Sequence, residues 1–209
     1  MKRKLLLIGG GGHCHSVLDS AIRTGVFDDF GIVDNTDCSY FGVSVVGTDD
    51  DISQLVKNGW TDAFVTVGSI GEPIIRRRLY EMIKKNQLSI PSIIDPTAVI
   101  ATDVRVGIGT FVGKNTVVNS GSVIGECSII NTGTVIEHDC IIGDFVHVSP
   151  GCTVCGQVHI GDDAHVGAGS VVIQQINIDE KVLIGAGSVV VNDIPANVKA
   201  YGNPCKVVI

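Results

Sequence analysis

The sequence has 209 residues, a formal net charge of −7 and a pI near 5.2, which argues against a nucleic-acid partner, because phosphate backbones attract basic proteins. Mean hydropathy is +0.37, yet no apolar run approaches the ~18 residues of a membrane-spanning helix, so no membrane partner is expected. The seven cysteines are an odd number, and the apolar patch behind the basic start is too short for a secretory signal. We therefore expect reduced thiols and a cytoplasmic protein.

The beginning of the chain predicts one β-α-β unit. Residues 4–8 are expected to form a strand, the four glycines at 9–12 a tight turn, residues 13–24 a helix and residues 30–33 a second strand. Glycines between a strand and a helix leave backbone N–H groups free to meet a phosphate. The complete G-x-G-x-x-G fingerprint is absent, because His15 or Cys14 falls at its last position, so a nucleotide sugar is favoured over NAD. The alternative is a turn that only joins strand to helix.

The next segment continues this α/β pattern. A strand is predicted over 62–67, a turn at Gly68, a helix over 72–86 and a last short strand over 89–94. The apolar side of the helix is expected to carry Ile75, Leu79, Met82 and Ile83. The arginines at 76–78 are most simply a solvated face. Residues 1–92 would thus form a small α/β domain, too short for a complete dinucleotide fold.

A strict repeat of six residues follows. Ile or Val recurs at every sixth residue, at sixteen consecutive positions from Ile100 to Val190. A hexapeptide period is typical of a parallel β-helix, in which three hexapeptides make one coil. Small or β-branched residues stand two places before each aliphatic residue, which suits a tight interior. Glycine follows it at positions 107, 113, 125, 143, 161, 167 and 185, where a corner needs φ > 0 or close backbone approach. We predict a β-helix over 93–192 and a terminal cap over 193–209.

The same register predicts which side chains stack. Residues eighteen apart lie on successive coils at roughly 4.8 Å, so His138 has Gly156 beside it and open space over one ring edge. His138 is therefore a candidate general base, and the acidic residues on either side would raise its basicity. In a flat strand Glu137 and Asp139 would both point away, whereas a corner would bring Asp139 round. The alternative is a solvated turn histidine.

Other histidines and cysteines offer a rival interpretation. His147 and His165 stack as a pair and are individually expected to be surface residues, while His159 occupies the equivalent position on another face. Three converging histidines would bind zinc, as in a carbonic-anhydrase-like β-helix, and a non-catalytic scaffold is the other possibility. The Cys152-x-x-Cys155 pair lacks a second pair of ligands, and the register separates the two thiols. No metal is expected.

Four segments carry a resemblance to a known family. They are Gly9-Gly-Gly-Gly-His13, Asn131 to Gly143, His147-Val-Ser and Gly202-Asn-Pro-Cys-Lys206. The chain resembles, over essentially its whole length, the bacterial sugar acetyltransferases of the sialic acid O-acetyltransferase type. That group includes the bacillosamine-pathway and perosamine N-acetyltransferases. The resemblance implies a left-handed β-helix, acetyl-CoA as co-substrate, a nucleotide-sugar substrate and a homotrimer with active sites between subunits.

The resemblance also implies roles for particular residues. His138 would be the general base, and Asp139 would strengthen it. The positions that match acetyl-CoA contacts are His147, Gly156, Ala168 and Ala186. The positions that match the nucleotide-sugar pocket are Gly12, His13, Cys14, Asp34, Asn35 and Gly68. N-acetylation of a UDP- or GDP-linked amino sugar is favoured, since a nucleotide pocket gives the first domain a purpose, and O-acetylation of a sialic acid is the alternative.

The histidine spacing leads to the same oligomer. His138 and His147 are nine residues apart, which is half a coil, so they lie on different sides of one column. They can approach each other only across a subunit boundary, most simply in a cyclic trimer.

Overall fold

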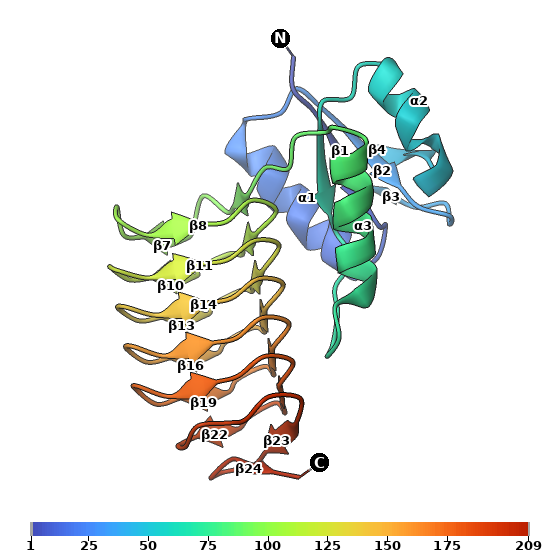
Figure 1. Ribbon diagram of the computed structural model, residues 1–209. Coiled ribbons are helices and arrows are strands. Elements are labelled where there is room, and N and C mark those ends of the chain that lie inside the picture. The colour runs from blue at the N-terminus through green and yellow to red at the C-terminus, as the bar shows by residue number, and fades with distance from the viewer. Residues whose placement is uncertain (1, 209) are drawn as a thin grey trace.

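The computed structural model describes residues 2–208 and confirms an α/β domain followed by a parallel β-helix (Figure 1). The first domain is a five-stranded sheet of order β3-β4-β2-β1-β5, in which only the edge strand β3 runs antiparallel to its neighbour. Its strands are β1 (Lys4–Ile8), β2 (Asp29–Val33), β3 (Ser39–Tyr40), β4 (Val43–Gly47) and β5 (Asp62–Val65).

Three helices and one 3-10 turn complete this domain. They are α1 (Gly12–Thr24), η1 (Asp49–Asp51), α2 (Ile52–Lys57) and α3 (Ile74–Lys85). The helix predicted over 72–86 begins two residues later, because Pro73 is its N-cap. The predicted strand over 89–94 reduces to β6 (Ile93–Ile94), with a single bridge from Ser89 to β5. None of the helices in residues 2–208 has the length and apolarity of a membrane-spanning segment.

The repeats form three faces, each a ladder of two-residue strands in parallel register eighteen residues apart; the terminal strands β23 and β24 extend one of these faces without this spacing. The β13 face consists of β7 (Val99–Ile100), β10 (Val117–Val118), β13 (Val135–Ile136), β16 (Thr153–Val154), β19 (Val171–Val172) and β22 (Val189–Val190). The β14 face consists of β8 (Arg105–Val106), β11 (Val123–Ile124), β14 (Ile141–Ile142), β17 (His159–Ile160) and β20 (Asn177–Ile178). The β15 face consists of β6, β9 (Phe111–Val112), β12 (Ile129–Ile130), β15 (His147–Val148), β18 (His165–Val166), β21 (Leu183–Ile184), β23 (Lys199–Tyr201) and β24 (Lys206–Val207).

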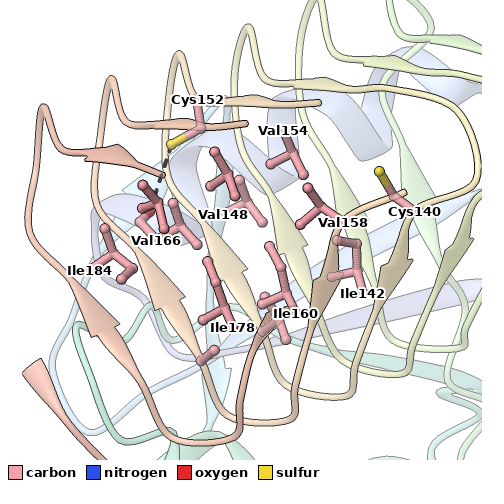
Figure 2. Packing of buried hydrophobic residues seen from close by; sticks show 14 of the residues in the cluster. Cys140, Ile142, Val148, Cys152, Val154, Val158, Ile160, Val166, Ile178 and Ile184 are labelled. Atoms are coloured by element: carbon pink, nitrogen blue, oxygen red, sulfur yellow. Dashed lines mark hydrogen bonds between the residues drawn. The ribbon is translucent and has the colours of Figure 1, made fainter. Parts of the chain in front are cut away.

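In the strands of the repeats, β7 to β22, the second residue points into the column. Figure 2 shows these aliphatic side chains stacked along its axis, with Cys140 and Cys152 filling the narrow positions between them. The predicted small inward residues are buried throughout, with Thr134, Cys140 and Cys152 at 0 % exposure. Burying one Val or Ile fully contributes roughly 1.5–3 kcal/mol, so the repeated register accounts for most of the driving force for coil formation.

The corners explain the recurrent glycines. The glycine after each inward residue does not have a positive φ; instead, a Cβ at Gly107 or Gly167 would lie 2.5 Å from backbone atoms of the next coil. The positive φ falls two residues later, at Gly109 and Gly169 and also at Asp139. Of the two reasons expected from the sequence, close backbone approach is the one that holds at these glycines.

The first domain packs on the outside of the β15 face. Phe111, Ile129 and His165 are outward-facing residues of that face, yet they are only 2 %, 3 % and 5 % exposed. Phe111 and Ile129 belong to the same apolar cluster as strand β1 and helix α1, and the His13 ring meets Phe111 edge-on at 5.4 Å. At the other end β23 continues the parallel ladder, and β24 turns back antiparallel over it.

Candidate active site

His138 and Asp139 lie at the edge between the β13 and β14 faces. The left-handed conformation of Asp139, with φ 59°, turns its carboxylate toward the imidazole, and His138 Nδ1 lies 2.9 Å from Asp139 Oδ2. Both side chains are more than half exposed, at 58 % and 59 %. Because a carboxylate accepts hydrogen bonds, Nδ1 carries the hydrogen and Nε2 keeps its lone pair. The geometry is that of an oriented imidazole base.

Gly156 faces the free nitrogen of His138. A Cβ built on Gly156 would lie 2.5 Å from His138 Nε2 and 2.7 Å from Cε1. The ring therefore occupies space that any other residue at this position would fill. Gly156 is eighteen residues after His138, so the stacking that places them together follows from the coil length.

The Asp139 contact decides which acid orients the base. We expect Asp139→Asn to lower kcat by roughly one to two decades, a part of the usual contribution of a positioned base, because the neutral amide no longer holds the Nδ1–H tautomer. Asparagine tolerates the left-handed conformation, so the fold is kept. Initial rates measured beside those of Glu137→Gln, the other flanking carboxylate, provide the comparison. Equal effects of the two substitutions would exclude a specific role for Asp139.

The second group of predicted residues gathers where β1, β2 and β5 end. Gly12, expected in the glycine turn, instead begins α1, and His13 and Cys14 follow it in the first turn of this helix, as expected. Gly11 is the N-cap and makes no side-chain hydrogen bond. The first N–H groups of a helix have no partner within it and favour anions. A Cβ added at Gly11 or Gly12 would meet no neighbouring atom within 4 Å, so a ligand has room there.

The Cys14 side chain is turned away from this end of the sheet. It is fully buried in the apolar cluster under α1, and burial raises the pKa of its thiol to about 11. Cys14 can therefore offer a ligand only its backbone N–H.

Three further predicted residues, Asp34, Asn35 and Gly68, lie at the same end of the sheet. The two Asp34 carboxylate oxygens accept hydrogen bonds from the backbone N–H groups of Gly10 at 2.6 Å and Thr36 at 2.8 Å, so this side chain shapes the turn. Asn35 is exposed beside it. A Cβ on Gly68 would come within 3.7 Å of His13 Cβ, so the loop after β5 packs against the start of α1. The carboxyl ends of parallel strands are where α/β sheets bind ligands.

His147 lies at the junction between the two domains. Its Nδ1 is 2.9 Å from the Ser69 carbonyl, its Nε2 is 3.3 Å from Asn131 Nδ2, and its ring meets His165 edge-on at 4.8 Å. Burial lowers the pKa of His147 to about 3 and also lowers that of His165. The expectation of surface histidines was wrong for His165, which is buried, whereas His147 is only partly buried, under the loop after β5.

Arg76 was also expected in solvent and is buried instead, at 3 % exposure. Its neighbours Arg77 and Arg78 are exposed and form ion pairs with Asp163 and Asp49. The sequence contained a signal for this difference. Arg76 shares the i, i+3, i+4, i+7 stripe of the buried residues Leu79, Tyr80 and Ile83, whereas Ile75, expected on the apolar side, is 56 % exposed.

The remaining predicted positions lie elsewhere on the column. Ala168 and Ala186 are exposed and stacked at the edge between the β15 and β13 faces. A groove of about 830 Å³ runs along the opposite edge of the β15 face, between the start of α3 and the last coils, and Gly68 is the one predicted site residue that lines it. Residues 2–208 of one chain thus hold the His138 edge and the His147 face apart.

The rival zinc geometry receives no support from side-chain positions. His159 is exposed on the β14 face, whereas His147 and His165 lie on the β15 face. Cys152 points inward, with its thiol 3.2 Å from the Gly167 carbonyl, while Cys155 is partly exposed at a corner. Among the residues that the structure describes, no three His, Cys, Asp or Glu side chains converge as metal ligands.

Comparison with known proteins places both halves. The PglD N-terminal domain family matches residues 4–83, and the bacterial transferase hexapeptide family (six repeats) matches residues 139–174. A histidine variant of perosamine N-acetyltransferase from Caulobacter crescentus, solved with CoA and GDP-perosamine, is 35% identical with a TM-score of 0.92, over 98% of this chain and 96% of that one. The acetyltransferase domain of PglB from Neisseria gonorrhoeae FA1090, in complex with acetyl coenzyme A, is 34% identical with a TM-score of 0.93, over 100% of both chains.

A third solved structure shares the fold at lower identity. WeeI from Acinetobacter baumannii AYE is 24% identical, with a TM-score of 0.88 over 99% of this chain and 100% of that one. No curated protein matches the chain.

Proposed function

The chain belongs to the PglD-type sugar N-acetyltransferases, which join this N-terminal domain to hexapeptide repeats, and we propose that it transfers the acetyl group of acetyl-CoA to an amino group of a nucleotide-linked sugar. The observation that carries this proposal is the His138 imidazole, which Asp139 holds by Nδ1 and which presents a free Nε2 beside Gly156. The relatives solved with CoA, acetyl coenzyme A and GDP-perosamine support the choice of substrates.

The reaction is a direct transfer. The sugar amine attacks the thioester carbonyl and loses a proton to His138 Nε2; the C–N bond forms, the C–S bond breaks, and His138 returns the proton to the departing thiolate. A backbone N–H near Gly156 stabilises the oxyanion. No cysteine nucleophile is required: Cys140, the nearest in sequence, is fully buried, and burial raises the pKa of its thiol.

The complete site is proposed to form between two copies of the chain in a homotrimer. Three residues of the proposed nucleotide pocket, Gly12, His13 and Gly68, lie over the β15 face, near His147. His138 lies at the opposite edge of the same column. A neighbouring chain that places its His138 edge against this face would bring the nucleotide sugar and acetyl-CoA together beside His138. The β15 face and the exposed edge at Ala168 and Ala186 would hold acetyl-CoA. A monomer in sedimentation at micromolar concentration would contradict this arrangement.

Compartment and substrate chemistry follow from the same proposal. All seven cysteines carry free thiols, which supports a cytoplasmic location. The nucleotide pocket is assigned to Gly12, His13, the Cys14 backbone, Asp34, Asn35 and Gly68. An amine is favoured over a sugar hydroxyl because the perosamine relative, at 35% identity, is an N-acetyltransferase that was solved with GDP-perosamine.

One assay tests the proposal. Release of the CoA thiol is measured with acetyl-CoA and a panel of UDP- and GDP-linked amino sugars, with free and CMP-linked sialic acid as the hydroxyl acceptors. Turnover that requires both the nucleotide and the free amine is the expected result. Turnover only with sialic acid would contradict N-acetylation and support O-acetylation instead. If no acceptor accelerated release of the CoA thiol, the proposed transferase activity would be wrong.

A further inference from the structure

The guanidinium of Arg76 is buried at the domain junction without a matching carboxylate. In residues 2–208 no Asp or Glu oxygen comes within ion-pair distance of it, although Arg77 beside it has such a partner. Burial lowers the pKa of Arg76 to about 10. Burying an unpaired charge costs desolvation free energy, so the hydrogen bonds of this side chain have to compensate for that cost.

Arg76 donates to groups from both domains. Nη1 lies 3.2 Å from the Phe145 carbonyl and 3.4 Å from Ser69 Oγ, and Nη2 donates to the Cys127 carbonyl. Cys127 and Phe145 are equivalent corner residues of successive coils, and Ser69 belongs to the loop after β5. The planar fork thus fastens that loop to two coils of the β-helix at once.

Ser69 passes this constraint on to His147. The Ser69 carbonyl is the partner of His147 Nδ1 at 2.9 Å, and a carbonyl only accepts, so Nδ1 carries the hydrogen. On the other side, Asn131 Oδ1 accepts from the Thr132 N–H at 2.8 Å, which turns the Asn131 amide NH₂ toward His147 Nε2. Both contacts require a bare Nε2.

We propose that Arg76 is a positioning residue that, by holding Ser69 in place, fixes His147 as the Nδ1–H tautomer, so that His147 contacts acetyl-CoA only as a hydrogen-bond acceptor. The coenzyme part of this inference rests on the proposed function. An acceptor at Nε2 suits an amide N–H of the pantetheine arm, which would take the place of the Asn131 amide NH₂ that lies 3.3 Å from Nε2. It does not suit the thioester oxygen, so His147 neither stabilises the oxyanion nor supplies a proton.

The charges around His147 act in the same direction. The titratable groups that face it are His13 from α1, Arg76 from α3 and His165 from β18, and each disfavours a positive charge on the imidazole. With no carboxylate in this set, His147 stays neutral across the physiological pH range.

The tautomer is measured by long-range ¹H–¹⁵N NMR on the labelled full-length protein, with His147→Asn used to assign the ring signals. At pH 7 we expect a protonated Nδ1 and a bare Nε2, both before and after CoA is added. In Arg76→Met the tautomer becomes mixed. The pKa of His147 rises because one positive charge is lost, but burial, the larger cause, still keeps it below its ordinary value. Arg77→Met, the exposed neighbour, leaves both unchanged.

Coenzyme binding supplies the second readout. Arg76→Met is expected to weaken CoA binding by roughly five- to tenfold, the size of one lost hydrogen bond, and Arg76→Lys to recover part of it. Ser69→Ala removes only the hydroxyl contact; it serves if Arg76→Met does not fold, and a roughly twofold weaker binding is expected.

Two results would overturn the inference. One is an Nε2–H tautomer or an imidazolium at His147 in the wild-type protein. The other is unchanged His147 signals and CoA affinity in the folded variants. Because the NMR readout needs no acceptor sugar, a protein with this tautomer and CoA affinity that acetylates no nucleotide sugar would refute the proposed function and leave the inference standing.

Discussion

Replacing His138 with alanine is expected to lower kcat by roughly two to four decades, the usual contribution of a positioned general base. In the structure its Nε2 is the free nitrogen beside Gly156, while Nδ1 is held by Asp139. The substitution removes the acceptor for the amine proton and leaves the β15 face untouched. The dissociation constant for acetyl-CoA, measured by calorimetry, should therefore stay within about twofold of wild type, while thiol release collapses.

His159→Ala is the matched control for this prediction. His159 is an exposed histidine on the neighbouring β14 face, one coil further along, and it has no part in the proposed chemistry. We expect its kcat to be that of wild type. Wild-type turnover in His138→Ala would remove this residue from the mechanism, whatever the control shows.

Adding one methyl group at Gly156 is expected to be almost as damaging as removing the base. The new Cβ of Gly156→Ala would lie 2.5 Å from His138 Nε2, so the ring has to swing away and lose its alignment with Asp139. Misplacing a reacting group by about 1 Å can reduce the rate about a hundredfold, and we expect a fall in kcat of that order. Steady-state rates and the thermal midpoint are measured together, because overpacking also lowers stability by roughly 1–3 kcal/mol.

Gln157→Ala controls for an effect of the corner itself. Gln157 follows Gly156 and is exposed, with its side chain bonded to Gln175 rather than to His138. This variant should keep its activity. If Gly156→Ala turned over substrate as fast as Gln157→Ala, the imidazole would have room that the structure does not provide, and the assigned position of the base would be wrong.

The β-helix and the position of the candidate base His138 beside Gly156 were predictable from the sequence because both follow from one period. The run from Ile100 to Val190 sets the inward positions, and the eighteen-residue coil stacks Gly156 on His138. The role of a corner in turning Asp139 toward the ring was foreseen as one of two outcomes, and the positive φ at Asp139 decides between them.

Features that depend on the contact between domains were not predictable in this way. His147 and His165 occupy outward positions, which the repeat alone assigns to solvent. The packing of the first domain buries His165 and partly buries His147. Arg76 was hidden in a run of three arginines, where charge suggested water and helix periodicity suggested the interior. Strand β3 has two residues and helix α2 six, which is too few to establish a period. Strand β4 alternates between exposed and partly buried residues and contains no buried apolar run.

Two of the contacts between the first domain and the β-helix have a consequence for the number of coils that such proteins can have. His13 contacts Phe111, and Ser69 contacts His147; between them the ladder passes only Ile129, so the α/β unit spans two rungs, or roughly 10 Å. A coil inserted or deleted between Phe111 and His147 would break one of these two contacts. After His165 this constraint no longer applies. Whole coils can be added there without changing the distance between the start of α1 and His147.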